Sequence, residues 1–359
     1  MHIDDKFIGS SLSEKDSLIH QHIAVTPQPV MPRVPRILKK THLERMPFSG
    51  TTSAVMEAIR RVRVERLPEF FEQTCDRRLH ETAVICGSAQ LTYQELDQRA
   101  NRLAHFLISR GVGKGNPVGI LLERSLDTYT SLLGVLKAGA AFVPLDPSFA
   151  SDLVAFIAED TGLRDLVTTS MFREETSALS CPVLELDQEY EALSMQPENR
   201  PQVFVDPVSL CYIIYTFDTT GRPKGVAISH ASIVNFLRVV TPIYRVTRND
   251  RVYQGMSIAF DASLEEIWLT WIAGATLVAA PTDSQRLDHW LTEFLVERKI
   301  SMLYCMPSLL ATIERDVPSL RSLIIGGEVY PTDLVNHWSH PKQRMLNTYN
   351  PTETTLTAT

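Results

Sequence analysis

The 359-residue sequence has few of the features that mark secreted, metal-binding or membrane-spanning chains. Its five cysteines are odd in number and form no C-x-x-C pair, so neither a disulfide framework nor a structural zinc site is predicted. It has no apolar run of the roughly 18 to 20 residues that a membrane-spanning helix needs. The first residues, MHIDDKFIGSSLSEKDS, lack the apolar core of a secretory signal. We therefore expect a cytoplasmic protein without a membrane span.

Basic charge is also scarce relative to acidic charge. The 35 lysines and arginines are outnumbered by 42 acidic residues, which gives a formal net charge of -7 at pH 7. Nucleic acids and anionic membranes bind basic surfaces, so neither is an expected partner. Apolar residues, in contrast, make up 44% of the chain, enough at this length to build one large domain or two lobes.

The first 63 residues differ in composition from the rest. Four prolines lie between positions 27 and 35, and basic residues follow at positions 36, 39 and 40. This composition predicts a partly disordered leader or linker, with a proline-rich recognition motif as the alternative. The folded domain is expected to begin at residue 64.

Beyond Leu67, helical and strand patterns alternate. The stretch 93–110 has apolar residues spaced four, three and four apart, which predicts a helix that ends at Gly111. Further helices are expected at 231–240 and 264–273. Short apolar runs predict buried strands at 118–122, 140–145, 210–215, 251–256, 276–280, 301–306 and 323–325. Apolar strands separated by helices indicate an α/β fold with layered parallel sheets and flanking helices.

The stretch YTFDTTGRPKG, residues 215–225, follows one of these strands. It offers backbone N–H groups, threonine hydroxyls and one lysine ammonium, which together suit a polyphosphate. The spacing of a Walker loop is absent. For this string alone, a polar surface turn is the alternative.

The same stretch resembles the phosphate-binding signature YTSG(S/T)TGxPKG of adenylate-forming enzymes, specifically the amino-acid adenylation domains of nonribosomal peptide synthetases. Other motifs of that family occur in the expected order: LTYQEL at 91–96, LLGVLKAGAAFVPLD at 132–146, FDAS at 260–263, IIGGE at 324–328 and NTYNPTE at 347–353. The resemblance runs from about residue 64 to the end and is strongest to ε-poly-lysine-type synthetases. It is a resemblance to the N-terminal part of such a domain.

The resemblance implies an AMP-forming ligase that uses ATP and Mg²⁺ to activate an amino acid and passes it to the thiol of a phosphopantetheinyl carrier protein or domain. It places around the phosphates and adenine of ATP the residues Thr216, Thr219, Thr220, Gly221, Lys224, Gly326, Gly327, Glu328 and Tyr349. Thr352 and Glu353 are the implied catalytic residues, and Glu353 also holds the metal. Taken alone, Glu353 would be a solvated surface charge.

The resemblance also implies that Asp261 pairs with the α-ammonium of the substrate. The other implied pocket residues are Ala262, Glu265, Tyr304, Ile324, Gly326, Thr348, Leu356 and Thr357. Glu265 lies four residues after Asp261, on the same helix face, and favours a basic substrate such as lysine, ornithine or diaminobutyrate. The alternative is that one of the adjacent Glu265 and Glu266 is merely a solvated charge, because neighbouring residues cannot share one helix face.

Three positions depart from the family pattern. Phe217 and Asp218 replace a Ser-Gly pair, which removes a hydroxyl and adds a charge that repels phosphate. Asn350 replaces a glycine, a milder change because asparagine tolerates positive φ. The family's C-terminal lobe would lie beyond Thr359, so we expect residues 1–359 alone to lack pyrophosphate-exchange activity. A degenerate, non-catalytic binding module is the alternative function.

Overall fold

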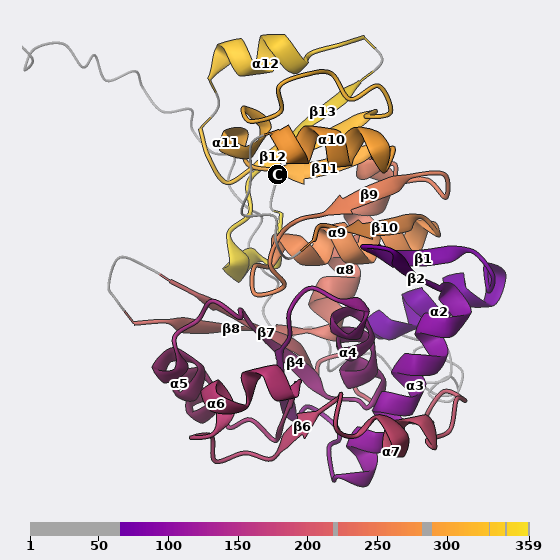
Figure 1. The fold of residues 1–359 in the computed structure, drawn as a ribbon, viewed down its shortest axis with the longest axis vertical. Coiled ribbons are helices and arrows are strands. Elements are labelled where there is room, and N and C mark those ends of the chain that lie inside the picture. The colour runs from indigo at the N-terminus through magenta and orange to yellow at the C-terminus, as the bar shows by residue number, and fades with distance from the viewer. Residues whose placement is uncertain (1–64, 218–221, 282–288, 330, 342, 358–359) are drawn as a thin grey trace, which may run out of the picture. The chain divides into compact units, whose positions relative to one another are not determined.

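The computed structural model describes residues 65–217, 222–281, 289–329, 331–341 and 343–357 (Figure 1). These residues belong to one compact unit, Arg63–Thr359. The expected leader at positions 1–63 lies outside the described residues, so its disorder stays a prediction. No described helix has the length and apolar character that a bilayer crossing requires.

Two sheets organise the described residues (Figure 1). The seven-stranded sheet has the order β13 (Arg344–Thr348), β12 (Ser322–Gly326), β11 (Met302–Cys305), β9 (Arg251–Gln254), β10 (Thr276–Ala279), β1 (Thr82–Cys86) and β2 (Ala89–Thr92). The six-stranded sheet has the order β6 (Val183–Glu185), β5 (Asp165–Thr168), β3 (Pro117–Leu121), β4 (Ala141–Leu145), β7 (Leu210–Thr216) and β8 (Lys224–Ser229). The predicted α/β class with layered, mainly parallel sheets is confirmed.

Each sheet ends in one antiparallel pair, β1–β2 and β7–β8, which the prediction of parallel sheets did not include. The physical reason is the length of the connections. A parallel pair needs a crossover of a dozen or more residues, whereas only residues 217–223 join β7 to β8. The candidate phosphate loop is therefore the connection of a β-hairpin.

The helices cover and connect the sheets. They are α2 (Leu67–Arg77), α3 (Tyr93–Ser109), α4 (Leu126–Lys137), α5 (Ser151–Thr161), α6 (Arg173–Thr176), α7 (Tyr190–Ser194), α8 (His230–Tyr244), α9 (Ala262–Ala273), α10 (His289–Glu297), α11 (Pro307–Leu310) and α12 (Thr332–Trp338), with 3-10 turns η2 (Ser170–Phe172) and η3 (Thr352–Thr354). Helix α3 begins at Thr92, whose hydroxyl accepts the Glu95 N–H at 3.2 Å while the Glu95 carboxylate accepts the Thr92 N–H at 2.8 Å. Helix α8 runs to Tyr244, beyond the expected end at residue 240, and buries that tyrosine.

Helix α9 is buried on all sides, because it packs against α2 and α8 and against strands β9 and β10. Trp268 and Trp271 are fully buried, as the apolar pattern indicates. Glu265 and Glu266 are also buried, with exposed fractions of 1% and 0%. The alternative of a solvated charge at one of these glutamates is therefore wrong, because both carboxyl groups are buried within the fold.

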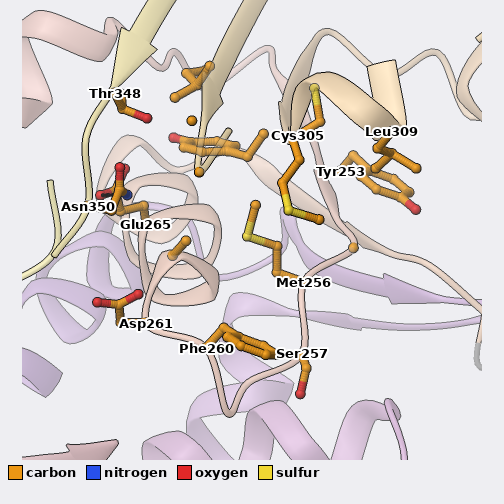
Figure 2. Close-up of a pocket in the computed structure, with 17 residues that line it drawn as sticks. Tyr253, Met256, Ser257, Phe260, Asp261, Glu265, Cys305, Leu309, Thr348 and Asn350 are labelled. Carbon is orange, nitrogen blue, oxygen red and sulfur yellow. Dashed lines mark hydrogen bonds between the residues drawn. The ribbon is translucent and has the colours of Figure 1, made fainter. Parts of the chain in front are cut away.

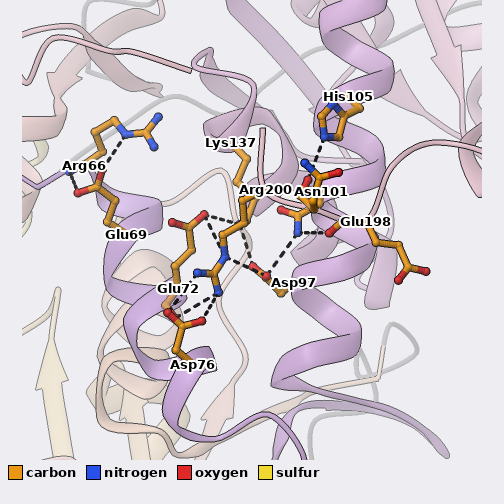
Figure 3. Close-up of polar contacts among 11 residues, drawn as sticks. Arg66, Glu69, Glu72, Asp76, Asp97, Asn101, His105, Lys137, Glu198 and Arg200 are labelled. Carbon is orange, nitrogen blue, oxygen red and sulfur yellow. Dashed lines mark hydrogen bonds and ion pairs between the residues drawn. The ribbon is translucent and has the colours of Figure 1, made fainter. Parts of the chain in front are cut away.

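A charge cluster of Glu72, Asp76, Asp97, Lys137 and Arg200 ties α2, α3 and α4 to the segment before β7 (Figure 3). The Lys137 ammonium lies 2.5 Å from a Glu72 oxygen and 2.8 Å from an Asp97 oxygen. The Arg200 guanidinium bonds Asp97 at 3.1 Å and Asp76 at 2.7 Å. Every acid of the charge cluster therefore has a protein cation beside it.

Candidate active site

A cavity of about 430 Å³ lies at the carboxyl ends of the neighbouring parallel strands β9, β11, β12 and β13 (Figure 2). The last residues of these strands and the residues that follow them line it, together with the first turn of α9. Ligands of open α/β sheets collect at this end of the strands. Of the sequence-predicted site residues, the structure brings together around this cavity Asp261, Ala262, Glu265, Tyr304, Ile324, Gly326, Gly327 and Thr348.

The two sides of the cavity differ in chemistry (Figure 2). Asp261 and Glu265 lie on one side, with Thr348 and Asn350 beyond them. The other side is mainly apolar and is formed by Tyr253, Met256, Cys305 and Leu309. Met306 also lines the cavity. None of these five is among the site residues predicted from the sequence, because none of them carries a charged group that would indicate a ligand.

Asp261 is the residue that precedes helix α9, and it is 7% exposed. Its Oδ2 is buried and accepts no hydrogen bond from the residues that the structure describes. Burial raises the pKa of this carboxyl, bonds from the Thr352 hydroxyl and the Ala262 N–H lower it, and the nearby Glu353 charge raises it. A buried carboxyl with an open acceptor atom is suited to a cationic ligand.

Glu265 follows one helical turn later and is surrounded by neutral donors. The Tyr244 hydroxyl donates to Oε2 at 2.8 Å, while the Thr357 hydroxyl and the Asn350 amide, the latter at 3.4 Å, donate to Oε1. Burial raises its pKa to about 7, against the lowering effect of the bonds from Thr357 and Tyr244. No lysine, arginine or histidine of the described ranges forms an ion pair with it.

Glu266 points to the loop that forms the cavity wall. It accepts hydrogen bonds from the Gln254 amide at 2.9 Å and from the backbone N–H groups of Gly255 and Met256, both at 3.4 Å. The Tyr129 hydroxyl bonds Gln254 in turn, at 2.6 Å. Burial raises the pKa of Glu266 to about 8. Glu266 thus holds the wall in place, whereas Glu265 lines the cavity itself.

The candidate phosphate loop is described only at its ends. Thr216 and Lys224 face each other as paired residues of the β7–β8 hairpin, and the Thr216 hydroxyl donates to the Lys224 carbonyl at 3.5 Å. Thr219, Thr220 and Gly221, together with Asp218, lie outside the described residues. The Phe217 ring is half exposed and packs edge-on against Phe149, with centroids 5.5 Å apart.

Glu328 and Tyr349, expected at the adenine, and Glu353, expected at the metal, do not line this cavity. Glu328 accepts hydrogen bonds from the N–H and the hydroxyl of Ser308, both at 2.9 Å, and Tyr349 is 67% exposed. Thr352 and Glu353 form the turn η3. No cluster of three or more His, Cys, Asp or Glu in the described ranges could hold a metal ion. One carboxylate such as Glu353 suits Mg²⁺, which takes its other ligands from phosphates and water.

Three residues differ from what the sequence indicates. Leu356 is fully buried in the core and does not line the cavity. Thr357 does not line it either, but its hydroxyl bonds Glu265 and accepts from the Tyr244 hydroxyl at 3.4 Å. From the sequence, Asn350 is expected to replace a glycine at little cost because asparagine tolerates positive φ. That explanation is wrong, since Asn350 is not among the described residues with positive φ. Its side chain instead lines the cavity and contacts Glu265.

Tyr244 is a member of the site that sequence reasoning missed. It lies at the end of α8, 21 residues before Glu265, and no motif surrounds it. The aromatic pair that it forms with Tyr304, with centroids 6.0 Å apart, comes from tertiary packing. No signal in the sequence could have assigned it to this site.

Comparison with known proteins finds relatives that match most of this chain. Over 290 residues the chain is 38% identical to a linear gramicidin synthase of Brevibacillus parabrevis, a match that covers 80% of this chain and 4% of that relative. Over 294 residues it is 36% identical to delta-poly-L-ornithine synthetase of Acinetobacter baumannii, covering 82% of this chain and 22% of that relative. The chain therefore spans only a minor part of the length of these curated relatives.

Solved structures agree as well. The nonribosomal peptide synthetase FmoA3 with bound α-methyl-L-serine-AMP superposes with a TM-score of 0.74 at 29% identity, over 82% of this chain and 34% of that chain. The N-terminal domain of FACL13 from Mycobacterium tuberculosis, at 23% identity, shares the fold with a TM-score of 0.73, over 80% of this chain and 76% of that chain. Residues 71–359 match the family model described as AMP-binding enzyme. That match extends over most of the sequence, and the chain belongs to the family of AMP-binding enzymes.

Proposed function

We propose that this chain carries the substrate-binding part of an enzyme that activates an α-amino acid with ATP. The observation that carries the proposal is the buried Asp261 carboxyl, whose Oδ2 has no partner among the described residues and which lines the cavity. An α-ammonium group would supply the missing charge and the missing donor. A buried carboxylate without such a partner is unfavourable, so the bound amino acid is stabilised relative to ligands that lack the α-ammonium.

The side chain of the substrate is proposed to be basic. Glu265 lies in the same cavity, about 6 Å further along the helix axis than Asp261. Lysine, ornithine and diaminobutyrate each carry a second ammonium that can meet it. A neutral side chain would leave Glu265 without a counter-charge, at a cost of about 1 to 3 kcal/mol, or about tenfold to a hundredfold in affinity. The similarity to a relative named as a poly-ornithine synthetase supports this proposal.

The proposed reaction joins the substrate carboxylate to the α-phosphate of ATP and releases pyrophosphate. Within this chain, Thr352 would contact the α-phosphate, and the hairpin residues from Thr216 to Lys224 would bind the leaving phosphates. Gly326, Gly327, Glu328 and Tyr349 would border the adenine. A Mg²⁺ ion held by Glu353 would neutralise phosphate charge. Transfer of the product to a phosphopantetheinyl carrier thiol is part of the same proposal and rests on the nonribosomal peptide synthetases among the relatives.

A non-catalytic binding module is the second candidate. It is favoured by the half-exposed Phe217 ring, which occupies a hairpin position where a hydroxyl would serve the phosphates. In that case the chain would bind the amino acid at Asp261 without using ATP. Calorimetric titration with ATP and Mg²⁺ separates the two candidates, because only the enzyme requires nucleotide binding.

The amino-acid proposal is tested by titrating the chain with three matched ligands. Ornithine carries both ammonium groups, 5-aminopentanoate lacks the α-ammonium, and norvaline lacks the side-chain ammonium. Ornithine is expected to bind at least tenfold more tightly than either of the others. Equal binding of ornithine and 5-aminopentanoate would refute the role of Asp261, and equal binding of ornithine and norvaline would refute the basic side chain.

A further inference from the structure

Glu265 fixes the orientation of the Asn350 amide. The two side chains lie 3.4 Å apart at Glu265 Oε1, which is a carboxylate oxygen that can only accept when the group is ionised. The atom of Asn350 that faces Glu265 must therefore be the nitrogen, Nδ2. The amide oxygen, Oδ1, consequently faces away from the carboxylate.

The Asn350 amide oxygen lies close to Gly326, which lines the cavity. A Cβ at Gly326 would stand 3.4 Å from Asn350 Oδ1 and only 2.5 Å from the Thr348 hydroxyl oxygen, so a larger residue at position 326 would crowd both side chains. Gly326 and Asn350 both line the cavity. Oδ1 is buried and has no donor among the described residues. A buried amide oxygen without a donor is unfavourable, which indicates a donor from a ligand.

The Tyr304 hydroxyl is a second buried oxygen without a hydrogen-bond partner among the described residues. Tyr304 lines the cavity and is only 3% exposed. Its ring packs edge-on against Tyr244, with centroids 6.0 Å apart, and Tyr244 in turn bonds Glu265. The Tyr304 hydroxyl thus belongs to the same shell of side chains as the Glu265 carboxylate.

We infer that Asn350 and Tyr304 complete, with Glu265, a subsite for a primary ammonium group on the substrate side chain, and that Asn350 is a specificity-determining residue. The inference rests on the proposed function and extends it. A primary ammonium has three N–H donors, and the subsite offers three oxygen acceptors from three side chains, one of which carries the charge. A terminal methyl group satisfies none of them, and a planar guanidinium has five donors in a fixed fork that three separate acceptors do not match. The subsite therefore selects a side chain that ends in a primary amine.

The test measures ornithine and norvaline affinities for the chain and for two variants by calorimetry. Asn350→Leu removes the amide oxygen and nitrogen while keeping the number and branching of the side-chain heavy atoms, and Tyr304→Phe removes only the hydroxyl. Each variant is expected to lose about tenfold to a hundredfold in ornithine affinity, because one acceptor of a charged donor is lost, and to bind norvaline at least as well as before. Asn347→Leu is the matched control, because Asn347 is exposed on β13, does not line the cavity and should leave both affinities unchanged.

The outcomes distinguish a failure of the ammonium subsite from a failure of the proposed function. If the unmodified chain prefers ornithine and both variants keep that preference, the subsite is wrong and the proposed function stands. If the unmodified chain binds ornithine and norvaline equally, both the proposal of a basic substrate side chain and the subsite are wrong. Should Asn350→Leu not fold, as a melting curve would reveal, Tyr304→Phe decides alone, since the loss of one oxygen leaves the packing shape intact. Arginine is expected to bind at least tenfold more weakly than ornithine.

Discussion

The molecule contains two groups of acids that differ in their surroundings. In the charge cluster, Lys137 and Arg200 lie within ion-pair distance of Glu72 and Asp97 (Figure 3). At the cavity, the acids of α9 are surrounded by hydroxyls, amides and backbone N–H groups (Figure 2). Asp261, Glu265 and Glu266 form no ion pair with any described lysine, arginine or histidine.

The pKa values of the acids in the two groups shift in opposite directions. The bond from Arg200 lowers the pKa of Asp76 in the charge cluster. Burial raises the pKa of Asp261, Glu265 and Glu266 at the cavity. The charge of the first group is neutralised within the fold, whereas Asp261 and Glu265 line the cavity without a cation from the described residues and can accept one from a ligand. Perturbed acids that gather in a cavity are characteristic of binding and catalytic sites.

The largest expected effect comes from breaking the charge cluster. Lys137→Met removes the buried ammonium, whose side chain is 1% exposed, and leaves Glu72 and Asp97 with Arg200 alone. We expect a loss of about 3 to 5 kcal/mol in the free energy of unfolding, measured by chemical denaturation. Arg315→Met is the control, because the exposed Arg315–Glu293 pair should contribute at most about 1 kcal/mol. Equal losses in the two variants would show that Lys137 is not a structural cation.

The opposite behaviour is expected at the cavity, where removing charge should affect binding and not folding. Asp261→Asn keeps the shape of the side chain and removes an acid that has no cation beside it among the residues that the structure describes. The melting temperature should stay the same or rise. The affinity for ornithine should fall by up to about a thousandfold, since a charge pair at ~4 Å and an effective dielectric constant near 20 contributes about 4 kcal/mol before desolvation.

Binding of 5-aminopentanoate provides the control for this variant. That ligand lacks the α-ammonium, so its affinity should be the same for the unmodified chain and for Asp261→Asn. A parallel loss of both ligands would mean that Asp261 shapes the cavity and does not meet an ammonium. A lowered melting temperature would mean that the carboxyl is needed for folding.

The free energy of unfolding should depend on pH in opposite directions for the charge cluster and for the acids of α9. Glu265 and Glu266 titrate near 4.5 in the unfolded chain and at about 7 and about 8 in the folded one, so unfolding releases protons between these values. Their contribution to stability is present below about pH 4.5 and is lost as the pH rises to 7 and 8. The charge cluster behaves in the opposite way, because the lowered pKa of Asp76 makes its contribution disappear as the pH falls.

Ligand binding should follow the ionisation of Glu265. Because an ammonium prefers the ionised carboxylate, ornithine affinity should rise by up to about tenfold per pH unit between pH 6 and 7 and level off above. Calorimetry in buffers of different ionisation enthalpy should register proton release on binding. Glu265→Gln should abolish the pH dependence, whereas a dependence that persists in this variant would assign the titration to another group.

The contrast between these regions explains how much the sequence could predict. The apolar runs predicted helix α9 and the strands β3, β4, β7, β9, β10, β11 and β12, because these depend on local pattern. The resemblance to adenylation domains, and not the local pattern, placed Asp261, Glu265 and Tyr304 in one pocket. Local pattern cannot tell which helix is covered on all sides, so the burial of Glu266 was missed. Asn350 lies 85 residues from Glu265 and meets it only through the fold.

The smallest expected effect concerns the neutral donors that hold Glu265. Tyr244→Phe removes the hydroxyl that donates to Oε2 at 2.8 Å and leaves the ring packing against Tyr304. We expect a loss of about 1 kcal/mol in the free energy of unfolding. Because the tyrosine bond lowers the pKa of Glu265, its removal should raise that pKa further, and the pH at which ornithine affinity levels off should move upward.

Tyr93→Phe is the matched control for this change. The Tyr93 hydroxyl donates to the Ala275 carbonyl at 2.8 Å in an equally buried place away from the cavity. It should therefore lower stability by a similar amount, about 1 kcal/mol, and leave the pH profile of ornithine binding unchanged. If both variants shift the profile equally, the shift reports a general loosening of the fold. If only Tyr244→Phe shifts it, the neutral donors around Glu265 set the pH at which the cavity accepts a cation, and the acids of α9 differ from the charge cluster in function as well as in partners.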